Sequence, residues 1–118
     1  MIVSAYTDGS CNPHSPDKFG AYAVVFIARN GNKNHMKTIK SKRYSKTTIA
    51  RMELKAIIRV LGHCDVGHTI DVYSDSQFVV NAINQWVDGW IASGKIHKKA
   101  NPGLWFRFQK QRKRHLEG

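Results

Sequence analysis

Residues 47–75 read TTIARMELKAIIRVLGHCDVGHTIDVYSD, and this segment predicts a helix followed by a strand. Apolar residues recur at the spacing of one helix face, Thr47 or Thr48 is placed to cap the helix, and Gly62 is expected to end it. Residues 69–74 alternate in polarity and end at Asp75, as a strand does where it enters a loop. The apolar face of the helix consists of Ala50, Leu54, Ile57, Ile58 and Leu61.

Three strands are expected before this helix. Residues 2–7 are partly β-branched and run into Asp8-Gly9-Ser10, while residues 20–28 (GAYAVVFIA) are apolar enough for a buried central strand. Asn30-Gly31-Asn32 tolerates a tight turn, so residues 33–42 should return as the second arm of a hairpin. With the later strand parallel to the first, this order predicts an α/β fold. Its mixed sheet would combine antiparallel hairpin strands with a parallel βαβ unit, flanked by helices.

The remainder of the chain is expected to be helical. Residues 76–83 predict a short helix, residues 85–103 a helix followed by a basic loop, and residues 104–115 a last helix. The basic run at 110–114 is expected to face solvent. The chain has 118 residues, 42% of them hydrophobic, with no internal repeat or low-complexity linker. These numbers suit one compact core, so residues 1–118 are expected to form a single domain.

Basic residues strongly outnumber acidic ones. There are 19 Lys and Arg against 8 Asp and Glu, a formal net charge of +11, which favours an extended acidic polymer as partner. The plainer alternative is that this charge only confers solubility. The opening residues lack a secretion signal, no apolar stretch is long enough to cross a membrane, and Cys11 and Cys64 have no metal-binding spacing. A reduced, cytoplasmic protein that binds nucleic acid fits these features best.

Three acidic residues stand at positions where a sheet of this kind gathers ligands. Asp8 and Asp75 follow the first and fourth strands, whose carboxyl ends should lie side by side, and Glu53 borders the apolar helix face. Carboxylates this close would repel one another, so a hard divalent cation, Mg²⁺ or Mn²⁺, is expected between them. Each acid also has an ordinary structural alternative. Asp8 and Asp75 could cap turns or helices, and Glu53 could pair with Arg51 or Lys55.

The chain resembles the ribonuclease H family in a series of short motifs. They are, in order, TDGSCNP at 7–13, RMEL at 51–54, SDSQFVV at 74–80 and NQW at 84–86, followed by Trp90. Each motif alone is common, whereas their order, spacing and placement on strand, helix and strand are specific. The match extends from residue 3 to about residue 110. The resemblance implies the ribonuclease H-like fold and endonucleolytic hydrolysis of the RNA strand of RNA/DNA hybrids.

The resemblance also implies a role for each motif. Asp8 would bridge two metal ions, Mg²⁺ or Mn²⁺, with Glu53 and Asp75 completing the second site, so these three are the expected catalytic and metal-binding residues. The RNA strand would be read in the minor groove, where 2′-hydroxyls identify it. The DNA strand would be held in a phosphate pocket and on an aromatic and basic protrusion. The residues expected on these three surfaces are, in turn, Ser10, Cys11, Asn12 and Gln77; Lys46, Thr48 and Asn101; and Trp86, Trp90, Lys95, Lys98 and Lys99.

The chain departs from the family pattern in three places. The loop between Cys11 and Gly20 carries two prolines where the family has a glycine-rich turn. Ile49 and Ala50 occupy positions where the family has polar amides that face the hybrid. The sequence is C-terminally short, because it ends at Gly118, before the strand, loop and helix that supply the family's fourth acid.

The short C-terminus leads to two further expectations. Glu117 is the remaining downstream acid and has no evident route to the site, so a hybrid-binding module with weak or no catalysis stays open as the alternative function. Without a further strand, the fourth strand would form an open sheet edge. Such an edge invites a homodimer, either through that edge or by segment exchange.

Overall fold

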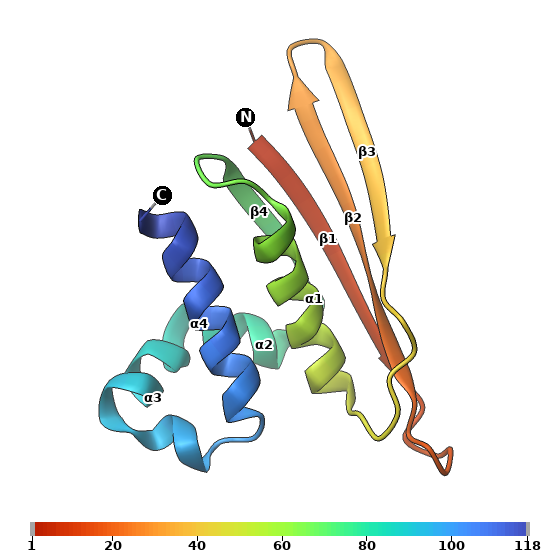
Figure 1. Ribbon diagram of the computed structural model, residues 1–118, viewed down its shortest axis with the longest axis vertical. Coiled ribbons are helices and arrows are strands. Elements are labelled where there is room, and N and C mark those ends of the chain that lie inside the picture. Colours follow the sequence, from red (N-terminus) through yellow and green to blue (C-terminus); the bar gives the residue numbers. More distant parts are fainter. Residues whose placement is uncertain (1, 118) are drawn as a thin grey trace.

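The computed structural model describes residues 2–117 and contains the mixed sheet that the sequence predicts (Figure 1). Within these residues no helix is both long enough and apolar enough to span a bilayer. The strands are β1 (Ile2–Cys11), β2 (Gly20–Asn30), β3 (Lys33–Lys40) and β4 (Thr69–Tyr73). The helices are α1 (Ile49–His63), α2 (Gln77–Asn81), the π-helical turn η1 (Ala82–Trp86), α3 (Val87–Ser93), the 3₁₀ helix η2 (Lys95–Lys98) and α4 (Pro102–Glu117).

The sheet has the strand order β3-β2-β1-β4. β2 pairs antiparallel with both β3 and β1, whereas β4 runs parallel to β1, so the expected hairpin and βαβ unit are confirmed. Gly31, at φ 64°, lies in the turn between β2 and β3, where a residue without Cβ is favoured. β3 and β4 form the two edges of the described sheet, which confirms the open fourth strand expected from the sequence.

β1 is longer than predicted, and this changes where Asp8 lies. The sequence predicts a strand that ends at Thr7, but β1 runs to Cys11, with Asp8 paired to Ala23 and Cys11 paired to Gly20. That prediction is wrong because it weighs only the local turn tendency of Asp-Gly-Ser. The long partner strand β2 supplies hydrogen bonds that keep these residues extended. Asp8 therefore lies within a strand, with its backbone fixed on one side by β2.

The other boundaries differ by a few residues. β3 ends at Lys40, two residues earlier than predicted, and α1 continues through Gly62 to His63. Of the two threonines that could cap α1, it is Thr48 that does so, because its Oγ1 accepts a hydrogen bond from the backbone N–H of Arg51 at 3.2 Å. These differences leave the order and type of the predicted elements unchanged.

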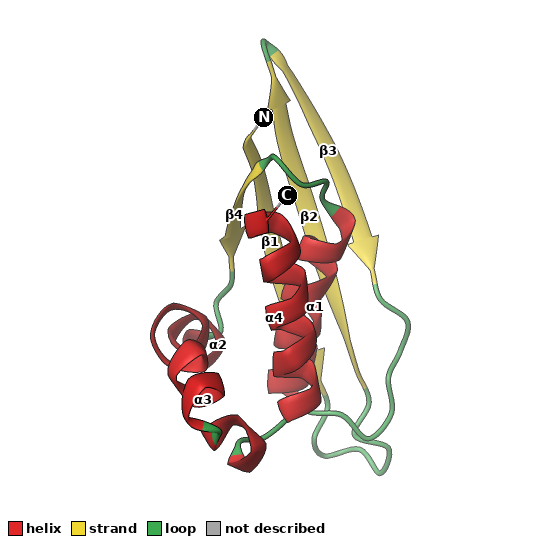
Figure 2. Ribbon diagram, turned by 60° about the vertical axis from the view of Figure 1, so that its left-hand side comes forward, coloured by secondary structure: helices red, strands yellow, loops and turns green. Residues whose placement is uncertain are grey.

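Helix α1 packs against the sheet on one side and against α4 on the other, and Figure 2 shows both helices on the same side of the sheet. The apolar face predicted for α1 is confirmed for Leu54, Ile57, Ile58 and Leu61, which pack in the cluster that contains α4. The residues of α1 that face the sheet, Ala56 and Val60, lie outside the predicted face. The hydrophobic cluster between α1 and the sheet includes Val3, Ala5, Val24, Phe26, Ala56 and Val60. The hydrophobic cluster between α1 and α4 includes Leu54, Ile57, Ile58, Leu104, Trp105 and Phe108.

The segment after β4 is more helical than the sequence predicts. α2, η1 and α3 follow one another without a break from Gln77 to Ser93, and the basic run after them forms η2. The prediction of a loop for that run is wrong because Ile96 is buried in the same cluster as α4, and this packing orders the turn around it. The segment therefore presents its lysines on a fixed backbone.

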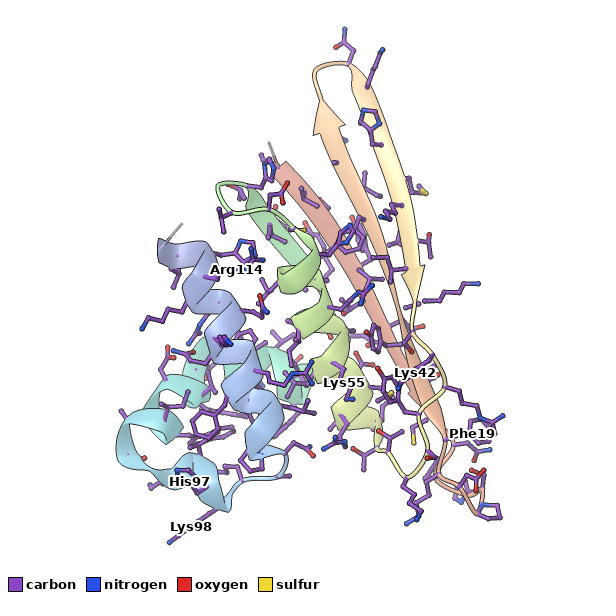
Figure 3. All side chains as sticks on the ribbon, in the orientation of Figure 1. Phe19, Lys42, Lys55, His97, Lys98 and Arg114 are labelled. Carbon is purple, nitrogen blue, oxygen red and sulfur yellow. The ribbon has the colours of Figure 1, made fainter. Side chains whose placement is uncertain are left out.

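The basic end of α4 is bound to the rest of the protein. Arg112 forms an ion pair with Asp88, and Arg114 donates to the backbone oxygens of Leu61 and Cys64, the latter at 3.1 Å. Figure 3 shows Arg114 between the ends of α4 and α1. The expectation that this run faces solvent is therefore wrong for Arg112, which is half-buried. Arg114 is exposed as expected, but it also joins α4 to α1, two segments far apart in the sequence.

Candidate active site

Three carboxylates meet where β4 ends. Asp8, Glu53 and Asp75 come from β1, from α1 and from the residues after β4, and their ligand oxygens lie within 4.8 Å of one another. The parallel register explains the first pair. Tyr6 is opposite Tyr73, the last paired residues, so Asp8 and Asp75 each lie two residues beyond the same point. The structure thus brings together the three acids that the sequence singles out.

Glu53 is the buried member of this group, with 4% of its surface exposed, whereas Asp8 and Asp75 are exposed. Its Oε1 accepts a hydrogen bond from the backbone N–H of Gly9 at 3.0 Å, and its Oε2 accepts one from the Ser74 hydroxyl at 3.5 Å. Burial raises the pKa of Glu53 above its ordinary value; the charges of Asp75 and Asp8 add to this effect, and the Gly9 hydrogen bond opposes it. A cation placed among the three acids would relieve both burial and repulsion.

The structure does not contain the capping and ion-pairing roles that were the ordinary alternatives for these acids. Helix α2 is capped by Ser76 and not by Asp75. The guanidinium of Arg51 donates to Asn101 at 2.8 Å instead of pairing with Glu53. In the described part of the chain, no basic side chain forms an ion pair with any of the three acids. Their negative charge is therefore uncompensated by the protein itself.

The three acids fit a hard divalent cation. Carboxylate oxygens are the ligands that Mg²⁺ and Mn²⁺ prefer, and such an ion compensates the repulsion among them. A hollow of about 420 Å³ reaches Glu53 and Asp75 from solvent, and its other lining residues include Gly9, Ile49 and Phe78. A cation and a phosphodiester can therefore both approach the acids. Ile49 and Phe78 make one wall of this opening apolar.

The residues expected in the minor groove lie together at the end of β1. Ser10, Cys11 and Asn12 line a hollow of about 440 Å³, with Arg43 stacked on the Phe19 ring at 3.7 Å beside it. Ser10 and Asn12 are exposed. Cys11 is half-buried, and its thiol donates to backbone oxygens of neighbouring loops at 3.5 and 3.8 Å. The two exposed side chains are thus the more accessible to a nucleic-acid strand.

Two of the three residues expected to hold a phosphate are linked through Arg51. Its guanidinium donates to Oδ1 of Asn101 at 2.8 Å, and its backbone N–H donates to Oγ1 of Thr48 at 3.2 Å. Lys46 and Asn101 both adopt positive φ, 51° and 61°, which is uncommon for residues with a Cβ. The Lys46 side chain is exposed and forms no hydrogen bond with the other two within the described residues. Arg51 therefore adds a cationic group to the expected phosphate pocket, between Thr48 and Asn101.

The aromatic and basic protrusion forms, but its two candidate tryptophans differ in exposure. Trp86 is 38% exposed, whereas Trp90 is half-buried between Trp86 and Trp105, with its ring centroid 6.0 Å from each. Lys99 lies over the Trp90 ring at 4.8 Å, and Lys98 projects away from the fold (Figure 3). Trp90 therefore supports Lys99, and Trp86 is the more accessible ring.

Gln77 begins α2 beside the acids. It is exposed, and its amide donates to Oδ1 of Asn81, one turn later, at 2.9 Å. That bond is local to the helix and exposed, so exchanging it for a contact with a nucleic acid costs little. Gln77 is thus placed beside the acidic opening, with its side chain held along α2.

Sequence reasoning missed several residues of this site. Gly9 and Ser74 orient Glu53, and the signal for both was their position directly beside Asp8 and Asp75 in the motifs. Arg51 was considered only as a partner for Glu53, and its bond to Asn101 joins segments 50 residues apart, which no local pattern reveals. Phe78, which lines the opening, was also missed.

Comparison with known proteins identifies the family. The family profile described as RNase H matches residues 2–116. The chain belongs to the RNase H family. It is 36% identical to Ribonuclease H of Clostridium botulinum, over 96% of this chain and 76% of the relative. It is 37% identical to Ribonuclease HI of Haemophilus influenzae, over 96% of this chain and 71% of the relative.

Membership of the RNase H family confirms the resemblance carried by the motifs, and with it the class of enzyme. RNase H proteins are nucleases of the hydrolase class that depend on divalent metal ions. The acidic cluster of this chain is the feature that corresponds to such a metal dependence.

Two solved structures share the fold. LC9-RNase H1, a type 1 RNase H with the type 2 active-site motif, superposes with a TM-score of 0.72 at 24% identity, over 93% of this chain and 57% of that chain. The foamy viral protease-reverse transcriptase in complex with RNA/DNA hybrid superposes with a TM-score of 0.71 at 14% identity. That match covers 92% of this chain and 15% of the viral chain. The predicted ribonuclease H-like fold is therefore confirmed.

Proposed function

We propose that this RNase H family member hydrolyses the RNA strand of RNA/DNA hybrids at internal phosphodiesters, with divalent ions held by Asp8, Glu53 and Asp75. One observation carries the proposal: three carboxylates from three elements converge within 4.8 Å in a chain of net charge +11. Their mutual repulsion is unfavourable unless a cation neutralises it. The names of the relatives, Ribonuclease H and Ribonuclease HI, support the same activity.

The three acids differ in exposure and in hydrogen bonding, and these differences suit them to different roles at the metal site. Two Mg²⁺ or Mn²⁺ ions, when bound by them, supply the Lewis acidity that activates water and stabilises the leaving oxygen. Glu53 is fixed by hydrogen bonds from Gly9 and Ser74, so it presents its carboxylate in one orientation. Asp8 and Asp75 are exposed and accept no hydrogen bond from the described residues, so their oxygens are available as ligands.

The hybrid is held by surfaces around these acids. Exposed polar groups beside the end of β1 would contact the RNA strand, while cationic and aromatic groups beyond α1 would grip the DNA backbone. The viral neighbour that shares this fold is in complex with an RNA/DNA hybrid, which supports this class of partner. The proposed contacts are Ser10, Cys11, Asn12 and Gln77 for RNA, and Lys46, Thr48, Asn101, Trp86, Trp90, Lys98 and Lys99 for DNA.

A second candidate function is a hybrid-binding module with little catalysis. One observation favours it: among the described residues, the acidic group at the site has three members and no fourth. The side chain of Glu117, the remaining downstream acid, lies outside the described part. Three acids complete one metal site, whereas the other site would depend on Asp8 alone. Metal binding and hybrid binding could then persist while cleavage is weak.

The two candidates are separated by cleavage of an end-labelled RNA strand annealed to DNA, with Mg²⁺ or Mn²⁺ and with the Asp8→Asn variant beside the parent protein. Metal-dependent cutting that is absent in the variant supports the nuclease. Tight hybrid binding without cutting supports the binding module. If the chain neither cuts nor prefers hybrids over duplex DNA at matched salt, both proposals fail.

Three further assignments belong to this proposal: the number of domains, the location in the cell and the oligomeric state. Residues 1–118 would form a single domain, because the two hydrophobic clusters lie on opposite sides of one helix, α1. The cytoplasm would be its location, since both cysteines are free thiols. A homodimer would form through β4, an edge strand beside a hollow of about 300 Å³ lined partly by Ile70, Val72 and Phe108. A monomer mass by light scattering at high concentration would refute the dimer.

A further inference from the structure

A hollow of about 480 Å³ lies between α1, α4, β2 and the loop after β3. It is called the second hollow below, to distinguish it from the opening at the three acids. It shares no lining residue with the opening at the three acids. Lys55, in its wall, is two residues after Glu53 and therefore about 200° further round the axis of α1. The two hollows thus lie on different faces of one helix. Residues that line the second hollow include Tyr22, Tyr44, Lys55, Arg59, Arg107 and Gln111.

The second hollow is cationic. Lys55, Arg59 and Arg107 line it, and no acidic residue does. Neither arginine forms a hydrogen bond or an ion pair with any residue in the described range. The ammonium of Lys55 lies over the Tyr44 ring at 4.0 Å, and Lys42 approaches the same ring at 5.2 Å, side by side in Figure 3. The positive charge of this hollow is therefore not neutralised by the protein.

Neutral donors accompany these cations. Burial raises the pKa of Tyr22, and Tyr44 raises it further, whereas the charges of Arg59 and Arg107 act in the opposite direction. Both guanidiniums are thus within electrostatic reach of a buried phenol. Gln111 uses its Oε1 to accept from Arg114 at 3.1 Å, which leaves its amide N–H groups free to donate. The hollow therefore combines charge with hydrogen-bond donors, as an anion requires.

Exposed arginines on a helix often do no more than face water. The arrangement here differs, because cations from two helices converge on one concave space although like charges repel. Arg51, Lys55 and Arg59 also recur every four residues, so they form one row along α1. Arg51, at the end of this row, is the residue bonded to Asn101. The row therefore leads from the expected DNA-phosphate contacts to the second hollow.

We propose that the second hollow is a phosphate-binding site, in which Lys55, Arg59 and Arg107 bind a ligand that carries at least two negative charges. Two sources supply this chemistry. One is a nucleic-acid strand that continues along the row on α1 beyond the acidic site. The other is a free polyphosphate or nucleotide that binds independently of any hybrid. The site does not require that the chain cleave RNA.

The test compares two double variants. Arg59→Gln/Arg107→Gln removes two charges from the hollow, and Arg29→Gln/Lys33→Gln removes two from the exposed end of the β2–β3 hairpin. Tripolyphosphate binding is measured by calorimetry, and RNA/DNA hybrid binding is measured over a series of salt concentrations. Both measurements omit divalent metal, so the result does not depend on catalysis. Only the first variant should show weaker tripolyphosphate affinity, by about tenfold or more.

The hybrid measurement identifies the source. If the ligand is the nucleic-acid strand, Arg59→Gln/Arg107→Gln should weaken tripolyphosphate binding and also reduce the slope of log affinity for the hybrid against log salt. The slope should fall by about one for each phosphate that the variant no longer neutralises. Weaker tripolyphosphate binding with an unchanged slope indicates a free phosphate compound. If the two double variants behave alike in both measurements, the proposal is overturned. Should Arg59→Gln/Arg107→Gln not fold, the single variants Arg59→Gln and Arg107→Gln decide the question by the same comparison.

Discussion

The backbone N–H of Gly9 donates a hydrogen bond to Oε1 of Glu53 at 3.0 Å, which ties β1 to α1 directly beside Asp8. The two elements approach so closely that a Cβ on residue 9 would lie 2.9 Å from the backbone nitrogen of Glu53 and 3.1 Å from its Oε1. A side chain at this position would push strand and helix apart. The placement of Glu53 relative to Asp8 therefore depends on a glycine.

Gly9→Ala should disturb the acidic site and destabilise the fold. The added methyl must displace either the backbone or the carboxylate of Glu53, so we expect a loss of about 1–3 kcal/mol in the free energy of unfolding and weaker Mn²⁺ binding. Urea denaturation and calorimetric titration with Mn²⁺ measure the two effects. Gly89→Ala is the control, because nothing lies within 4 Å of its added Cβ. Equal effects of both substitutions would refute the close-approach argument.

Asp8→Asn should abolish cleavage without unfolding the protein. Its carboxylate serves the metal, and its removal relieves repulsion in the metal-free cluster, so the melting temperature without metal should not fall. We expect the rate of metal-dependent RNA cleavage to drop by about a hundredfold or more. Asp71→Asn, an exposed acid on β4, is the matched control and should keep its activity. A lower melting temperature for Asp8→Asn would show that the acid is structural.

The convergence of the acids could be predicted because topology fixes it. Asp8 and Asp75 follow two parallel neighbouring strands, and parallel pairing alone brings such residues together. Glu53 follows from the helix periodicity, which turns it toward the sheet. The extension of β1 through Asp8 to Cys11 could not be predicted, because it depends on the length of the partner strand β2. The type and order of elements thus come from local pattern, and their ends from pairing.

The contacts that refine the site were beyond prediction for a related reason. The hydrogen bond from Gly9 to Glu53 depends on the distance between strand and helix, which no residue pattern encodes. The same holds for Arg51, whose partner Asn101 belongs to a distant segment. Such contacts follow from packing, which is a property of the assembled core and not of a sequence window.

The stability of the metal-free protein should depend on pH through Glu53. Burial first, and then Asp75 and Asp8, raise its pKa in the folded state above the ordinary value of 4.5. A group with a raised folded pKa stabilises fully at pH values below its unfolded pKa, and this stabilisation is lost as the pH rises through the folded pKa. We therefore expect metal-free protein to lose stability, relative to Glu53→Gln, as the pH rises above about 4.5.

Denaturation of both proteins across this range measures that difference. Adding Mn²⁺ should reverse the trend in the parent protein alone, because the metal requires the deprotonated carboxylate. A constant difference between the two proteins at all pH values would show that Glu53 does not titrate differently in the folded state.

Lys98→Gln/Lys99→Gln should weaken hybrid binding without affecting its sequence dependence. Lys98 projects from η2, and Lys99 lies over Trp90 at 4.8 Å, so both are held where a phosphate backbone can reach them. The slope of log affinity against log salt should fall by about one for each phosphate left without its lysine. Lys37→Gln/Lys40→Gln on β3 removes equal charge from an exposed strand and serves as the control. Identical slopes for both variants would mean that the effect comes from net charge alone.

Arg114→Gln should destabilise the fold by releasing the end of α1. Arg114 donates to the backbone oxygens of Leu61 and Cys64, where α1 ends and its carbonyl groups lack helical partners. Its positive charge also lies favourably at that helix terminus. Because the side chain is exposed, we expect a modest loss of about 1 kcal/mol in the free energy of unfolding, smaller at high salt. Lys110→Gln, on the same helix and also exposed, should change stability by less than about 0.5 kcal/mol. Equal losses in urea denaturation would attribute the effect to charge on α4, whereas a loss confined to Arg114 assigns it to the hydrogen bonds that join α4 to α1.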